Sequence, residues 1–204
     1  MVGGTEWLRE LKEKLLLAAA GVGPLLQRDY WAVIRDSRLR PPEVAAVVAE
    51  RFACFPPGEL VRFRRMDGGE GPLEPGDVLD VDIRMAGACQ VGVVHRDRNS
   101  LTVATLAGHP EAGRITFGAY PNEAGDVVFH IRSRARSSTR SRLLGFRAMG
   151  DAMQTTTWTD FINRLAVEVG DGVEGVIHAE KRVVEETDED RAVPPVPTFV
   201  ATGE

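Results

Sequence analysis

The chain has 204 residues, of which 43% are hydrophobic and 27% charged, and its formal net charge is -5. This length suits one main domain with a sizeable core, and the composition excludes a collagenous, disordered or membrane-embedded chain. The negative net charge argues against a nucleic-acid-binding protein, because phosphate backbones are usually met by a strongly basic domain.

Residues 1–23 are predicted to form an amphipathic N-terminal arm. Thr5 is a suitable N-cap for a helix. The apolar side chains that follow it at helical spacing are Trp7, Leu8, Leu11 and Leu15. Such a stripe is usually buried, so we expect the arm to pack on the protein's own surface. Two alternatives are that it binds a partner or forms a homodimer.

The apolar run near the start of the given sequence is not expected to be a targeting signal or a membrane span. The apolar run at residues 15–22 resembles the core of a signal peptide, but the charges before it sum to zero, whereas a signal peptide starts with a net positive charge. No apolar run approaches the roughly 20 residues that span a bilayer. We therefore expect a cytoplasmic protein that does not bind membranes. Cys54 and Cys89 are too few for a disulfide framework, so both are expected to be buried free thiols.

The main domain is predicted over residues 24–184. Residues 29–36 alternate as in a strand, and Pro41 and Pro42 then open a helix, since proline is tolerated in the first turn. From Leu60 onward the hydrophobic period is two. The clearest segments are 79–85, 89–93, 101–105, 115–119 and 127–131, separated by polar or glycine-containing turns. This pattern predicts a meander of antiparallel strands with one apolar face.

A long helix is predicted at about residues 139–169, and it supplies the apolar layer that the strands need. One stripe along it is Phe146, Met149, Met153, Thr157 and Phe161, and a second is Trp158, Ile162, Leu165 and Val169. Residues 176–184 suit either a strand or a helix. Residues 185–204 are acidic and then proline-rich, which predicts a tail without packed structure.

The order of a helical arm, a strand, a helix, several strands and a long helix resembles the helix-grip fold of the START-like, pollen-allergen-like superfamily. The most specific local pattern is the segment from Thr105 to Gly113, Thr-Leu-Ala-Gly-His-Pro-Glu-Ala-Gly, which Phe117 follows. This segment resembles the signature of a bacterial and plant family, the domain of unknown function numbered nineteen-ninety. The resemblance covers roughly residues 27–166. It implies an α+β fold, in which a curved antiparallel sheet wraps around a long C-terminal helix, usually with a cavity between them.

The leading functional hypothesis is a bacterial binding module that holds a small hydrophobic or amphipathic molecule in this cavity. It rests on fold analogy. The predicted ligand contacts are Leu79, Val81, Ile83, Phe117, Phe129, Phe146, Met149 and Met153. A third hypothesis is an interaction protein that uses the arm, a basic face or the acidic tail. No cofactor is expected.

An enzyme is the second hypothesis, with His109 and Glu111 as its candidate catalytic residues. They lie two positions apart around Pro110, so in an extended loop both side chains can point the same way, and a carboxylate can orient an imidazole. The alternative is a structural turn in which the His109 ring bonds nearby backbone. None of the four histidines, His95, His109, His130 and His178, has the spacing of zinc ligands, and neither cysteine belongs to a CxxC pair, so no metal site is expected.

Arg132, Arg134 and Arg136 lie on one face of a predicted strand together with His130. No aromatic residue lies between them as a stacking site for bases, so they do not predict nucleic-acid binding. We expect them to pair across strands with acids such as Asp80 and Asp82.

Overall fold

The structure is a computed structural model that describes residues 9, 11–139, 147–193 and 195–197. Phe146, Trp7 and Leu8 lie outside the described residues, and of Met149 only the backbone is described. In chain order the elements are η1 (Ala18–Ala20), β1 (Val22–Ile34), α2 (Pro41–Arg51), η2 (Phe52–Cys54), β2 (Val61–Arg65), β3 (Val78–Ile83), β4 (Gly87–Arg96), β5 (Ser100–Thr105), β6 (Glu111–Pro121), β7 (Val127–Ser137), α4 (Arg147–Val169), β8 (Val173–Val184) and η3 (Asp188–Asp190).

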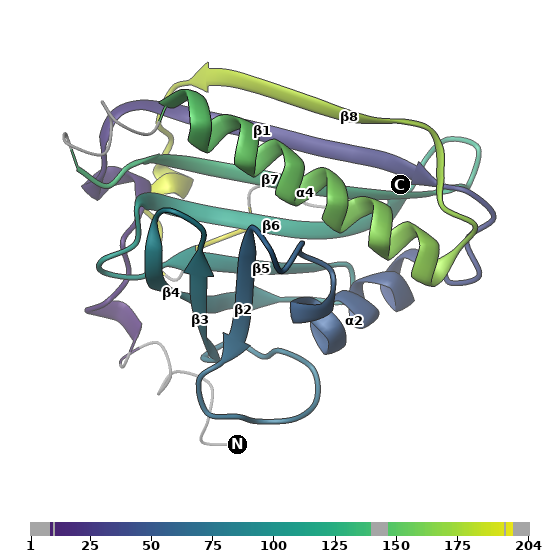
Figure 1. Ribbon diagram of the computed structural model, residues 1–204, viewed down its shortest axis with the longest axis horizontal. Helices are drawn as coiled ribbons and strands as arrows, with labels where there is room; N and C mark the ends of the chain where they lie inside the picture. Colours follow the sequence, from purple (N-terminus) through teal and green to yellow (C-terminus); the bar gives the residue numbers. More distant parts are fainter. Residues whose placement is uncertain (1–8, 10, 140–146, 194, 198–204) are drawn as a thin grey trace.

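The strands form one antiparallel sheet in the order β2-β3-β4-β5-β6-β7-β1-β8. The sheet curves, and α4 lies across its concave inner face, while α2 covers the end near β5 and β6 (Figure 1). This arrangement confirms the predicted α+β helix-grip fold. The segment that suited either a strand or a helix is β8, an edge strand paired with β1.

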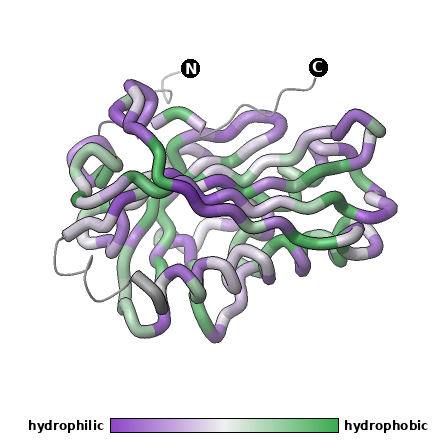
Figure 2. Tube along the Cα trace, turned by 90° about the horizontal axis from the view of Figure 1, so that it is seen from above, coloured by the Kyte–Doolittle hydropathy of each residue, from purple (hydrophilic) through white to green (hydrophobic). Residues whose placement is uncertain are grey.

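Alternation along most of the strands separates an apolar inner face from a more polar outer face, and Figure 2 shows this alternation as changes of colour along the chain. On β7, Phe129 and Ile131 are buried against the helices, whereas His130 and Arg132 point outward. β1 begins at Val22, seven residues before the predicted start, and so it pairs with β7 over most of its length.

The two halves of α4 differ in what they bury. In the C-terminal half, Phe161, Ile162, Leu165, Ala166 and Val169 are all at most 1% exposed and fill the core. From Gly150 to Trp158 the helix residues that face the sheet are of mixed size and polarity, as at Gly150, Met153 and Gln154, and they line a cavity. Space is therefore left between this half of the helix and the sheet.

The described part of the arm packs on the outside of the sheet, as expected. Leu11 is 3% exposed, and the Leu16 N–H donates to the Thr105 carbonyl at 2.8 Å. The predicted helix, whose apolar spacing runs to Leu15, ends earlier than expected, because the chain turns at Glu13 and Lys14 and Leu15 then forms a β-bridge with Leu106.

The prediction that the acidic tail lacks packed structure is wrong for its first part. Asp190 is 1% exposed and lies on the outer face of the sheet, where Arg114 and Arg134 donate to its carboxylate. Glu186 pairs with Arg136 at 2.8 Å. The sequence argument counted apolar surface alone, whereas this segment is held by ion pairs. Where the domain ends remains a prediction.

Candidate functional site

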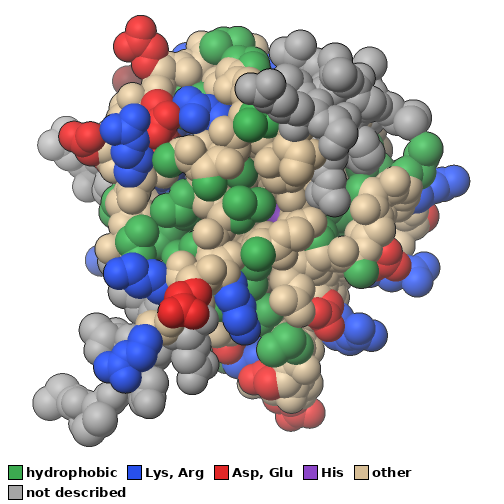
Figure 3. Space-filling model, turned by 90° about the vertical axis from the view of Figure 1, so that its left-hand side faces the viewer, with side chains coloured by type: hydrophobic (Ala, Val, Ile, Leu, Met, Phe, Trp, Pro, Cys, Tyr) green, Lys and Arg blue, Asp and Glu red, His purple; other side chains and the backbone are tan. Residues whose placement is uncertain are grey.

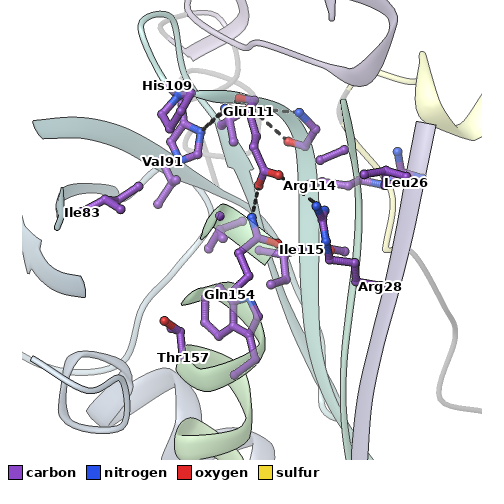
Figure 4. Close-up of a pocket in the computed structure, with 18 of the residues that line it drawn as sticks. Leu26, Arg28, Ile83, Val91, His109, Glu111, Arg114, Ile115, Gln154 and Thr157 are labelled. Atoms are coloured by element: carbon purple, nitrogen blue, oxygen red, sulfur yellow. Dashed lines mark hydrogen bonds and ion pairs between the residues drawn. The ribbon is translucent and has the colours of Figure 1, made fainter. Parts of the chain in front are cut away.

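A cavity of about 360 Å³ lies between the inner face of the sheet and the N-terminal half of α4 (Figure 4). Strands β2 to β7, together with β1 and β8, contribute to its wall, and η2 contributes Phe52. The helix residues that line the cavity are Gly150, Asp151, Met153, Gln154, Thr157 and Trp158, and they do not fill the space above the sheet as Phe161, Ile162 and Leu165 do farther along the helix. The strands supply valine, isoleucine and phenylalanine to the facing wall.

One end of the cavity is apolar and aromatic. The rings of Phe52 and Phe117 meet edge to face with centroids 5.0 Å apart, and Trp158 meets Phe117 in the same way at 5.5 Å. The aliphatic part of the wall is formed by Leu60, Val61, Val81, Ile83, Val91 and Val103, and Ile115, which also lines the cavity, lies directly across from Ser133 of β7. Edge-to-face packing holds the rings in fixed positions, so this end offers a shaped apolar surface.

The opposite end is polar and is organised around Arg28 of β1, whose side chain is 7% exposed. One guanidinium nitrogen donates to Asp151 of α4 at 2.8 Å, and another lies 3.4 Å from Glu111 of β6. Gln154 donates to the second oxygen of Glu111 at 2.6 Å, and Lys181 of β8 donates to Asp151 at 2.5 Å. Figure 4 shows Glu111 reaching in between Gln154 and Arg28.

Neighbouring charges shift the pKa of two members of this network, Arg28 and Asp151, in the direction that favours the ionised form. Burial by itself lowers the pKa of Arg28, but the nearby charge of Glu111 and the hydrogen bond with Asp151 outweigh it, so the pKa is raised. Burial raises the pKa of Asp151, and Lys181 and Arg28 reverse that effect and leave it lowered. Two cations and two carboxylates thus form a neutral, fixed polar end.

Several buried donors on cavity-lining residues have no hydrogen-bond partner among the described residues. Those of Arg114 and Arg136 belong to guanidinium groups that pair with Asp190 and Glu186 on the outer face of the sheet. The other two, Nε of Arg28 and the hydroxyl of Ser133, lie on the inner face. Arg28 and Ser133 are direct neighbours across β1 and β7. Buried polar groups are rarely left unpaired, so these two atoms call for an explanation.

The structure places His109 and Glu111 in different roles. The His109 ring, which is 8% exposed and lines the cavity, bonds through Nδ1 to the backbone of Glu111 at 3.0 Å. The Glu111 carboxylate is instead held by Arg28 and Gln154. This geometry matches the structural-turn alternative for His109. An acid-base role for the two residues remains an untested hypothesis.

The residues predicted as ligand contacts divide into two groups. Val81, Ile83, Phe117 and Met153 line the cavity. Leu79 and Phe129 lie instead in the packed core. Phe129 is covered because Phe161, in the bulky half of α4, stacks parallel to it with centroids 6.0 Å apart.

The polar end was missed by the sequence analysis, although the sequence carries a signal for it. Arg28 shares its strand face with Tyr30 and Ala32, and Ser133 shares its face with Ile131. Polar residues at such inward positions predict a buried polar site. The signal at Arg28 was overlooked because the predicted strand began one residue after it.

The outer face of the sheet carries a separate network. The three arginines of β7 pair there with Asp29, Asp190 and Glu186. The expected partners Asp80 and Asp82 are wrong, because they lie on β3, several strands away from β7, and Asp80 pairs with Arg64. Burial raises the pKa of Asp190, but Arg134, the Thr187 N–H and the charge of Arg114 lower it below its ordinary value.

Other predicted features can be located in the part of the chain that the structure describes. Cys54 is exposed and Cys89 half-buried, so the expectation of two buried thiols is wrong. In the described ranges no group of three or more His, Cys, Asp or Glu side chains could hold a metal ion. The helices of those ranges also lack the length and apolar character needed to span a membrane.

The end of the molecule at which β6 begins is shown in Figure 3. Hydrophobic side chains gather in the middle of this face, and charged side chains lie mainly toward its edge. The fold and the cavity together define a helix-grip protein whose internal cavity has one apolar and one polar end.

The family model described as "Domain of unknown function (DUF1990)" matches residues 45–164, which is more than half of the chain. The chain belongs to this family, and the resemblance based on residues 105–113 is confirmed. No curated protein matches the chain.

Solved structures share the fold at low sequence identity. A conserved protein from Geobacillus kaustophilus is 11% identical, with 75% of this chain and 98% of that chain covered and a TM-score of 0.50. The KanY protein is 11% identical, with 72% and 99% covered and a TM-score of 0.51. A START superfamily protein from Mycobacterium smegmatis is 12% identical, with 72% and 97% covered and a TM-score of 0.46. At such identities the likeness concerns the fold alone.

Proposed function

We propose that this protein binds one small hydrophobic or amphipathic molecule in the cavity between the sheet and α4. The observation that carries the proposal is the cavity itself. Its volume of about 360 Å³ falls in the range of about 300 to 1,000 Å³ that is usual for sites of small molecules. A filled interior would have given the proposal no support.

The distribution of side chains supports an amphipathic occupant. Ligand sites are mostly apolar, with a few polar groups that fix the orientation of the ligand. Here the aromatic and aliphatic wall would hold the body of the molecule, and the group around Arg28 and Gln154 would meet its polar end. Burying the apolar body would supply most of the binding free energy, at about 25 cal/mol per Å² removed from water.

The described parts of the arm and the tail give the interaction hypothesis less support. Leu11 packs on this chain's own sheet, and Asp190 is buried against this chain's own arginines. Both segments are therefore already engaged within the protein. A homodimer through the arm stays a prediction that the oligomeric state in solution would test.

A fluorescence titration with phenylnaphthylamine, an uncharged probe that brightens in apolar sites, tests the proposal. The wild type should take up the probe with saturation at one molecule per chain. Met153→Trp places a larger ring in the cavity wall and should reduce uptake at least tenfold, while the melting temperature stays within a few degrees, because the ring enters space that is not packed.

The matched control is Thr156→Trp, which adds the same ring at an exposed position of α4 away from the cavity. It should leave uptake unchanged. If the wild type takes up no probe and Met153→Trp is strongly destabilised, the interior is packed solid and the proposed function is wrong.

A further inference from the structure

The polar end of the cavity restricts the class of ligand further than the cavity as a whole does. The inference drawn from it rests on the proposed function. Arg28 Nε and the Ser133 hydroxyl are buried without partners among the described residues. The two side chains project from directly opposed positions of β1 and β7. Opposed positions on one face of an antiparallel pair bring Cβ atoms to within about 4.5 to 5.5 Å of each other.

Both atoms can donate a hydrogen bond. Arg28 Nε–H is a donor only, and a serine hydroxyl can donate one bond. A buried donor without a partner is unfavourable, so a site that keeps two of them side by side is suited to a ligand that supplies an acceptor. One oxygen with two lone pairs would satisfy both donors.

The surrounding charges decide which kind of oxygen fits. The other nitrogens of the guanidinium are engaged by Glu111 and by Asp151, so two carboxylates flank Arg28 at this end of the cavity. Asp151 is also paired with Lys181. The two cations and two carboxylates already balance, so an anionic ligand would add a buried negative charge that no further cation of this group offsets. A neutral carbonyl adds no charge.

We infer that the cavity binds a neutral, carbonyl-bearing molecule with an apolar or aromatic body, and that Arg28 Nε and Ser133 Oγ donate to its carbonyl oxygen. The aromatic rings of Phe52, Phe117 and Trp158 contact the body. Gln154 and Glu111 keep Arg28 in position for this contact, because Gln154 holds the carboxylate that pairs with the guanidinium.

Three probes that share one dimethylaminonaphthalene ring test the inference. The first carries a propionyl group, the second a propyl group of similar size, and the third a carboxylate. The wild type should bind the propionyl probe five- to tenfold more tightly than the propyl probe, which is the gain expected from one to two hydrogen bonds. The carboxylate probe should bind more weakly than the propionyl probe.

Ser133→Ala is the decisive variant, because it removes a hydroxyl that has no partner among the described residues and so should not lower the melting temperature. It should abolish most of the preference for the propionyl probe, leave the propyl probe unchanged, and shift the emission of the bound ketone to shorter wavelength. Arg28→Lys keeps the charge but lacks the Nε donor, and it should act in the same direction. Ser100→Ala, whose hydroxyl bonds to Asp97 outside the cavity, is the matched control and should leave the binding of all three probes unchanged.

The outcomes separate this inference from the proposed function. Equal binding of the propionyl and propyl probes, or tightest binding of the carboxylate, overturns the carbonyl site and leaves the binding function in place. A preference that survives Ser133→Ala and Arg28→Lys also overturns it. If none of the three probes binds, the proposed function fails together with the inference.

Discussion

Asp190→Asn is predicted to be among the most destabilising polar substitutions in the chain. The carboxylate accepts five hydrogen bonds: one from Arg114, two from Arg134 at 2.7 and 2.8 Å, and two from the backbone and side chain of Thr187. An asparagine amide keeps only one acceptor oxygen, so its nitrogen must face donors on one side.

The magnitude follows from burial. The Asp190 side chain is 0% exposed and that of Arg114 is 2% exposed, so the substitution leaves a guanidinium buried without a counter-charge. Removing one partner of a buried ion pair costs about 3 to 5 kcal/mol. For a chain of this size each kcal/mol lowers the melting temperature by about 2 to 4 °C, which gives a loss of about 6 to 20 °C.

Thermal unfolding followed by far-UV circular dichroism measures this loss. Glu189→Gln removes a neighbouring carboxylate that is exposed, and it should change the free energy of unfolding by no more than about 0.5 kcal/mol. Truncation after Val184 should destabilise the protein at least as much as Asp190→Asn. If Asp190→Asn melts within two degrees of the wild type, the C-terminal segment does not dock in solution as described.

Three further predictions concern pH, a glycine and the histidine. The pKa of Asp190 is lower in the folded chain than in the unfolded chain. Its contribution to the free energy of unfolding is therefore complete above about pH 5 and is lost as the pH falls below the unfolded pKa of about 4. The free energy of unfolding should therefore fall less steeply with decreasing pH in Asp190→Asn than in the wild type. Identical slopes for the two proteins would show that Asp190 is not the group responsible. Gly113→Ala should lower the free energy of unfolding, measured in denaturant melts, by about 3 kcal/mol, because a Cβ there would lie 2.1 Å from the Arg134 carbonyl oxygen. Gly58→Ala, the control, should leave the free energy of unfolding unchanged. Similar denaturation midpoints for the two variants would contradict the close approach at Gly113. His109→Ala should lower the free energy of unfolding in the same melts by about 1 kcal/mol, which is the value of one hydrogen bond. A collapse of the fold would show that His109 has a larger structural role.

The fold could be predicted from the sequence because the period of hydrophobic residues is a local property of each segment. The alternation at residues 79–85 and 127–131 and the stripes on residues 147–169 each report one buried face, and the element order then leaves few arrangements. β8 was ambiguous because most of its residues are exposed at the edge of the sheet, so burial imposes no period on it.

The site was only partly predictable, because a cavity is defined by what the packing leaves empty. The same apolar stripe of α4 includes Met153 at the cavity wall and Phe161 in the solid core. Nothing in their spacing distinguishes them. The pairing of Arg134 with Asp190 joins positions 56 residues apart, and sequence alone does not identify such a partner.

Methyl NMR of the wild type during titration with phenylnaphthylamine tests the central claim most directly, because it locates the probe as well as detecting it. Binding in the cavity should shift the methyl resonances of Val81, Ile83, Val103 and Ile115, which line it. Those of Leu79 and Ile162, in the packed core, should change little. The absence of any shift, or shifts confined to methyl groups outside the cavity wall, would contradict the claim that this protein binds a small apolar molecule between its sheet and α4.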